Sequence, residues 1–148
     1  MPRSVPPAPF KTSFSGEKPV WVNLYARFNS TTNTYRTRQS PRTKYGWRVK
    51  ALWLLHRDEK DPVPILITAV RSHRAVLFSI AGQGDGFVAT KTRRPVLDPS
   101  HAGHPDDPSK PDTHEWGSSV YFPKAGCYTA RAMVPGGGGW SFTFGFGR

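Results

Sequence analysis

One segment near the end of the chain, residues 140–146 ("WSFTFGF"), alternates strictly between aromatic and small side chains. Successive side chains of a β-strand point to opposite faces, so an extended segment would place Trp140, Phe142, Phe144 and Phe146 on one face. A helix, with its period of 3.6 residues, would scatter the same four rings around its axis. The segment therefore predicts a strand whose aromatic face is buried, with Trp140 as a structural residue.

The segment just before it, "AGCYTA" at residues 125–130, carries a second fold signal. Gly126 lies two residues before Tyr128, which is the spacing of the tyrosine corner of Ig-like sandwiches. In that corner the tyrosine hydroxyl bonds to backbone just upstream of its strand. We therefore expect Tyr128 to be buried and hydrogen-bonded, and we expect the glycine run at residues 136–139 to form the loop of the last hairpin.

Alternating or β-branched runs recur upstream, separated by turns in a chain that has 15 prolines and 14 glycines. The pattern predicts strands at residues 20–28, 47–56 (with Trp53 on the apolar face), 63–70, 75–82, 86–92 and 115–122. Residues 29–46 and 93–115 lack periodicity, so we expect them to be loops, the second long, Pro-rich and exposed. The fold class is therefore an all-β, Ig-like antiparallel β-sandwich of about seven or eight short strands.

A length of 148 residues fits one domain. Residues 1–18 are Pro-rich and polar, so we expect an extended arm there and a single sandwich over residues 19–148. No apolar run approaches the roughly 18–20 residues of a membrane span, and no hydrophobic stretch follows the first residues. Either the chain is cytoplasmic, or a leader was removed before residue 1.

Three short motifs in the second part of the chain occur in the same order as in a known group of domains. They are Lys50-x-Leu52-Trp53, then Phe122-Pro123-x-x-Gly126-Cys127-Tyr128, then the aromatic strand at residues 140–146. Over residues 45–148 the chain thus resembles uncharacterised Ig-like domains of bacterial cell-envelope and secreted proteins. The resemblance implies an extracellular or cell-envelope location and a non-catalytic structural or interaction module, which contacts another protein or a surface glycan.

The net charge is +11, and most of it lies in the first third of the chain. Residues 1–50 hold ten Lys and Arg against one acid, Glu17, which gives +9. Arginines with interleaved aromatics suit an anionic polymer, either a nucleic acid or an acidic polysaccharide, although they also suit a solvated loop. The candidate contact residues within residues 27–50 are Arg27, Tyr35, Arg36, Arg38, Arg42, Lys44 and Arg48.

Histidines and carboxylates crowd the Pro-rich segment, where His101, His104, Asp106 and Asp107 are weak candidates for metal ligands. They lack the spacing of known metal motifs, so we expect no metal and no cofactor. A single cysteine, Cys127, forms no disulfide within the chain, and we expect it to pack as a small core residue. Hydrolase motifs such as G-x-S-x-G and H-E-x-x-H are missing from the sequence, so we expect no enzyme activity.

Two functions therefore follow from the sequence. The first is a non-catalytic envelope module that contacts another protein or a larger assembly through the N-terminal arm or an edge strand. The second is a basic module that binds an anionic polymer through residues 27–50.

Overall fold

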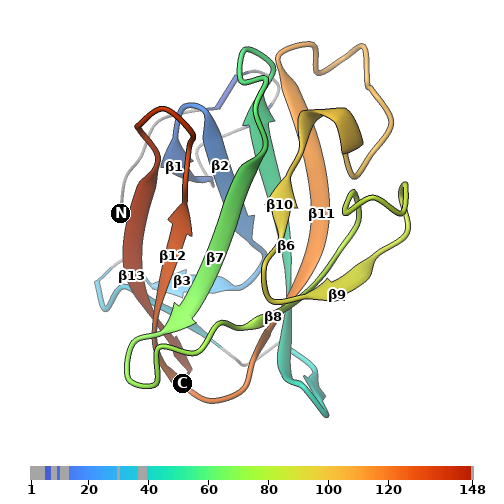
Figure 1. Ribbon diagram of the computed structural model, residues 1–148. Coiled ribbons are helices and arrows are strands. Elements are labelled where there is room, and N and C mark those ends of the chain that lie inside the picture. The colour runs from blue at the N-terminus through green and yellow to red at the C-terminus, as the bar shows by residue number, and fades with distance from the viewer. Residues whose placement is uncertain (1–5, 8–9, 11–13, 30, 37–39, 148) are drawn as a thin grey trace.

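A computed structural model of the chain describes residues 6–7, 10, 14–29, 31–36 and 40–147 and shows two β-sheets packed face to face (Figure 1). The first sheet has the order β1-β2-β6-β11-β8-β9, with β5 also paired to β6; the second has the order β10-β7-β12-β13-β4-β3. The strands of the first sheet are β1 (Ser15–Glu17), β2 (Val20–Leu24), β5 (Arg42–Thr43), β6 (Gly46–His56), β8 (Leu77–Ile80), β9 (Thr90–Thr92) and β11 (Thr113–Phe122). Those of the second are β3 (Arg27–Asn29), β4 (Thr34–Arg36), β7 (Val63–Ala69), β10 (Val96–Leu97), β12 (Gly126–Ala132) and β13 (Trp140–Gly147).

The arrangement confirms the prediction of an all-β sandwich. A single 3-10 turn, η1 (Pro99–His101), is the one helical element in the described residues. No described helix has the length and apolar character needed to cross a lipid bilayer.

The core between the sheets is built from the alternating residues that the sequence singles out. Trp53 of β6 is fully buried and stacks on Trp140 of β13, with ring centroids 6.4 Å apart. Trp116 of β11 lies opposite Trp53 in the strand register, so two indoles share the inner face of the first sheet. On β13, Phe142, Phe144 and Phe146 are all buried, which confirms the expected aromatic face.

Tyr128 forms the expected corner where the chain passes from the first sheet to the second. Phe122 ends β11, and β12 begins at Gly126 in the opposite sheet. The Tyr128 side chain is 2% exposed, and its hydroxyl donates to the Lys124 carbonyl oxygen at 2.6 Å. Burial raises the pKa of the Tyr128 phenol, so it stays protonated and keeps donating.

Replacing Tyr128 by phenylalanine should lower the free energy of unfolding by about 1–2 kcal/mol, because the Lys124 carbonyl loses its partner. Urea denaturation measures the change. Tyr45→Phe is the matched control, since Tyr45 is 38% exposed. Equal stability losses in the two variants would show that the corner hydrogen bond contributes nothing.

The described residues between 29 and 46 include strand that the sequence does not predict, so the expectation of a plain loop is wrong for them. β4 pairs in parallel with β13, with Tyr35 opposite Phe146, so the sandwich is not purely antiparallel. β5 pairs with the start of β6. Tyr35 is buried and packs edge-on against Phe144 at 5.3 Å, which gives β4 a place in the core. The described residues form thirteen strands, whereas the sequence predicts seven or eight. The difference arises because strands of two or three residues are too short to show periodicity in the sequence.

The segment 93–115 also departs from expectation at both ends. β10 adds two residues to the edge of β7, and its Leu97 is fully buried. β11 begins at Thr113, which is buried as well. Between these points the chain forms η1 and a series of turns, as expected for a Pro-rich segment.

Cys127 is exposed, so the prediction that it packs in the core is wrong. Its neighbour Tyr128 points inward, as does Ala130, and strand alternation then turns Cys127 and Thr129 away from the core.

The first described residues do not form a free arm. β1 pairs with β2, with Gly16 opposite Trp21. Phe14, Trp21 and Leu54 form a second small hydrophobic cluster, with Phe10 packed against it. The cluster lies on the side of the first sheet that faces away from the second sheet, called here the outer face. The arm boundary predicted at residue 18 is therefore wrong for residues 14–17, and residues 1–5, 8–9 and 11–13 of the predicted arm lie outside the described residues.

Candidate functional site

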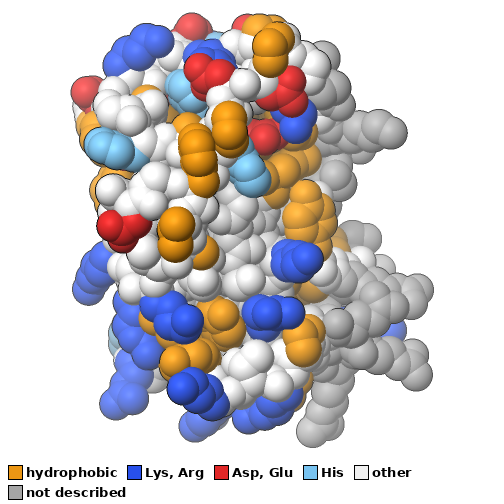
Figure 2. All heavy atoms as spheres, turned by 90° about the vertical axis from the view of Figure 1, so that its right-hand side faces the viewer, with side chains coloured by type: hydrophobic (Ala, Val, Ile, Leu, Met, Phe, Trp, Pro, Cys, Tyr) orange, Lys and Arg blue, Asp and Glu red, His pale blue; other side chains and the backbone are white. Residues whose placement is uncertain are grey.

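Charged side chains separate toward opposite ends of the sandwich. Figure 2 shows blue Lys and Arg gathered in the lower half of one face and red Asp and Glu mostly near its top. The lower end carries the β5–β6, β7–β8, β9–β10 and β11–β12 connections, and the upper end carries the β6–β7 turn and residues 98–115 (Figure 1). We call the lower group the basic end: Arg42, Lys44, Arg48, Arg71, Arg74, Arg93, Arg94 and Lys124. The upper group is the acidic end: Asp58, Glu59, Asp61, Asp98, Asp106, Asp107, Asp112 and Glu115.

Ion pairs with Lys and Arg hold several carboxylates of the acidic end, whereas the cations of the basic end lack such pairs in the described residues. Lys18 pairs with Asp58 at 3.3 Å, and Lys110 pairs with Glu115 at 2.9 Å. Within the described part of the chain, no cation of the basic end forms a salt bridge. Unpaired like charges held close together create a positive potential that attracts anions over several ångströms.

Aromatic rings hold several of these cations in place. The Arg42 guanidinium lies 4.0 Å from the ring centroid of Trp47. The ring of Tyr45 carries two ammonium groups, from Lys44 at 5.0 Å and Lys91 at 5.4 Å. Such cation–π contacts order long side chains without cancelling their charge, so they leave the cations able to bind an anion.

A shallow groove of about 400 Å³ crosses the outer face just above the basic end. Lys50, Ser79 and Ser119 line it, and Tyr25, 57% exposed, stands at its edge. Gly117 lies at its floor, where a Cβ atom would come within 3.1 Å of the His104 imidazole. The glycine therefore leaves room for His104 to lie over β11 and border the groove.

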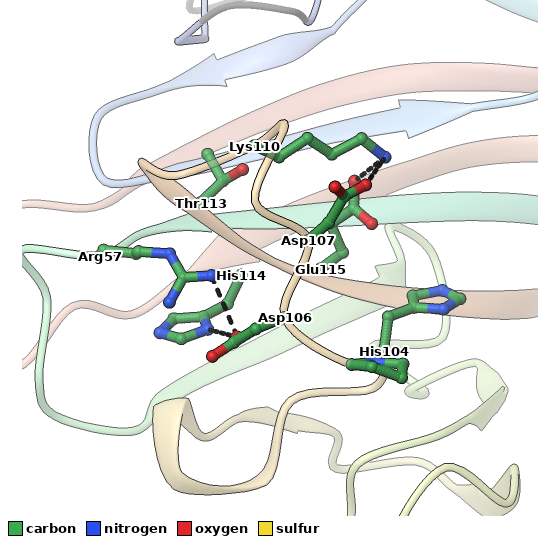
Figure 3. Close-up of a pocket in the computed structure, with 9 residues that line it drawn as sticks. Arg57, His104, Asp106, Asp107, Lys110, Thr113, His114 and Glu115 are labelled. Carbon is green, nitrogen blue, oxygen red and sulfur yellow. Dashed lines mark hydrogen bonds and ion pairs between the residues drawn. The ribbon is translucent and has the colours of Figure 1, made fainter.

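A compact charge cluster occupies the acidic end (Figure 3). Arg57 donates to Asp106 at 3.0 Å, and His114 Nδ1 lies 3.7 Å from the same carboxylate. The hydrogen bond from Arg57 lowers the pKa of Asp106. Burial lowers the pKa of His114, the Arg57 charge lowers it further, and both outweigh the opposing effect of Asp106. In Figure 3 the His104 ring points away from this cluster.

The lowered pKa of His114 predicts a loss of stability in mild acid. Above the ordinary histidine pKa of 6.5 the ring is neutral in both the folded and the unfolded chain. Between this value and the lower folded pKa the unfolded chain binds the proton and the folded chain does not, so the free energy of unfolding falls as the pH drops from 6.5 toward the folded pKa. Urea denaturation of the wild type and His114→Gln at neutral pH and at pH values just below 6.5 tests this. The variant should lose less stability over this range, and an identical loss in both proteins would contradict the assignment.

The structure gathers only part of the predicted contact set. Arg42, Lys44 and Arg48 meet at the basic end, but Arg36 belongs to β4 in the second sheet. Tyr35 is buried, so the prediction that it contacts a partner is wrong: its ring packs against Phe28 and Phe144. Arg38 and the side chain of Arg27 lie outside the described residues.

Sequence reasoning missed Lys91, Ser79, Ser119 and Tyr121, which join the site through strand pairing. Tyr121 lies opposite Arg48 and contacts Tyr45 edge-on at 5.5 Å. No sequence signal links these residues, because the sheet order alone sets β8 beside β11 and β9 beside β8.

The weak metal candidates point to different partners. His101 lies 3.2 Å from Asp98, Asp106 accepts from Arg57, and Asp107 accepts from Ser109. Among the described residues, no group of three or more His, Cys, Asp or Glu side chains is placed to hold a metal ion.

Comparisons of the chain with protein-family models, with curated proteins and with solved structures give no match. The candidate site therefore rests on its own geometry: unpaired cations, rings that hold them, and a polar groove beside them.

Proposed function

We propose that this chain is a non-catalytic interaction module that binds a polyanion at its basic end and along the adjoining outer face. One observation carries the proposal: the cations of the basic end are clustered without carboxylate partners in the described residues, while several carboxylates of the acidic end are paired with Lys or Arg. Charge that served only solubility would have no need to place the cations at one end of the molecule and the carboxylates at the other.

A protein partner bound through the N-terminal arm has less support. The described residues at that end, Phe14 and Ser15–Glu17, are already packed and paired within the chain's own first sheet. The Ig-like relationship and the cell-envelope location stay predictions of the sequence resemblance, and a polyanion at a bacterial surface is compatible with both.

Binding to inorganic polyphosphate tests the proposal, because this polymer offers negative charge without sugar or base. We expect the full chain to bind it with an affinity that falls as salt rises. The variant Arg42→Gln/Lys44→Gln/Arg48→Gln should bind more weakly. Its slope of log affinity against log salt should be shallower by about two units, at roughly 0.7 per lost contact.

The matched control neutralises cations at the other end. Lys18→Gln/Lys60→Gln removes two exposed lysines near the acidic end and should leave the affinity within about twofold of the wild type. Equal weakening by the two variants, or no salt-dependent binding at all, would refute the proposed function.

A further inference from the structure

A row of polar side chains crosses four neighbouring strands of the outer face. Lys50 lies opposite Ser119, Ser119 opposite Ser79, and Ser79 opposite Lys91, so the four side chains share one face. We call this the cross-strand row. Strands lie about 4.8 Å apart, so the two lysines are separated by roughly 14 Å along the row. Two cations thus flank two hydroxyls over the span of a few sugar rings.

The hydroxyls of the row are available to a ligand. Ser79 and Ser119 are half-buried and line the groove, yet within the described residues neither hydroxyl has a hydrogen-bond partner. Their neighbour Ser118 differs, because its hydroxyl donates to the Ala51 carbonyl at 2.9 Å. The groove floor therefore offers hydrogen-bonding groups that the fold does not use.

The aromatic rings of the basic end suit anion binding better than base stacking. Binding of single-stranded nucleic acid depends on a series of open ring faces on which successive bases stack. The Trp47 ring already lies against Arg42, and the Tyr45 ring against Lys44 and Lys91. Among the described residues that line the groove, Tyr25, which is 57% exposed, is the only Phe, Trp or Tyr, so the groove itself offers one ring rather than a series.

Building on the proposed polyanion binding, we propose that the natural ligand is an acidic polysaccharide that lies in the groove over Lys50, Ser119 and Ser79 and continues along the cross-strand row to Lys91, which lies beyond the groove lining. Its carboxylate or sulfate groups pair with Lys50 and Lys91, and its hydroxyls bond to Ser79 and Ser119. One sugar ring packs on Tyr25 at the groove edge. Charge complementarity selects an anion, and the free hydroxyls with a single open ring select a sugar chain over a nucleic acid.

Calorimetric titration of the full chain at low salt tests the ligand class. The probes are a galacturonate hexamer, a sulfated oligosaccharide of equal charge and a single-stranded oligothymidylate of equal charge. We expect at least one acidic sugar to bind about tenfold more tightly than the oligothymidylate. A tenfold difference in affinity corresponds to about one base-stacking interaction that the oligothymidylate fails to make.

Variants of the row locate the binding. Lys50→Gln and Lys91→Gln should each weaken sugar binding roughly fivefold. Ser79→Ala/Ser119→Ala should weaken sugar binding but leave oligothymidylate binding unchanged. The controls Lys60→Gln and Ser100→Ala alter exposed residues away from the groove and should change neither. Unfolding midpoints of all variants show whether each one folds.

The outcomes separate this inference from the proposed function. If oligothymidylate binds as tightly as both sugars, or the serine variant leaves sugar binding unchanged, the acidic-polysaccharide assignment is wrong. Salt-dependent polyphosphate binding would still support the polyanion module. If polyphosphate and every other probe fail to bind, the proposed function fails together with this inference.

Discussion

Replacing Phe122 by alanine should lower the free energy of unfolding by about 3–5 kcal/mol. Phe122 is fully buried at the point where the chain leaves the first sheet. Its ring stacks on Phe146 at 4.2 Å and meets Tyr128 edge-on at 4.9 Å. The truncation leaves a cavity between the first sheet and the rings of the second sheet, and tightly packed aromatic neighbours relax poorly into such a space.

Urea denaturation measures this loss, and Phe87→Ala is the matched control. Phe87 is 60% exposed, so its removal should change the free energy of unfolding by no more than about 0.5 kcal/mol. Similar losses for the two phenylalanines would mean that the sheets do not pack at this end as described.

Removing residues 1–17 should lower the free energy of unfolding by roughly 3 kcal/mol, because the truncation deletes Phe14 and exposes Trp21 and Leu54 to solvent. It also deletes β1, which pairs with β2 along the edge of the first sheet. The sequence predicts the opposite result, since a solvated arm could be removed without loss of stability. A melting temperature equal to that of the whole chain would restore the arm interpretation. As a milder change at the same site, Phe14→Leu keeps most of the apolar volume and should lower the free energy of unfolding by less than about 1.5 kcal/mol.

The sandwich is predictable from the sequence because its longest strands carry their own periodicity. Residues 47–56 and 140–146 alternate over enough positions to reveal one buried face, and Gly126-x-Tyr128 marks the corner between sheets. The adjacent buried pair Leu54 and Leu55 breaks that alternation, because Phe14 covers the outer face there. The sequence does not predict β4, β5 and β10. A strand of two or three residues forms because it pairs with another strand, and its own residues carry no signal of that pairing.

Only those residues of the candidate site that lie close together in the sequence could be predicted as a group. Arg42, Lys44 and Arg48 fall within one basic stretch, whereas Lys91 reaches the same surface through β9 at the far edge of the sheet. The error at Cys127 was avoidable: once Tyr128 is placed inward, its immediate strand neighbour must face outward. The error at Tyr35 was not, because "TYR" reads the same in an exposed loop and in a buried strand.

The separation of charge also fixes how the molecule meets a charged boundary. With its free cations at one end and its carboxylates at the other, the sandwich has a large electric dipole moment along its length. Near a negatively charged layer we expect the molecule to turn the end that carries Arg42 and Lys124 toward the layer and the end that carries Asp58 and Asp61 away from it. The carboxylate end of a bound copy would then attract the basic end of the next copy, so at low salt the molecules would stack head to tail on such a surface, and added salt would disperse the stack.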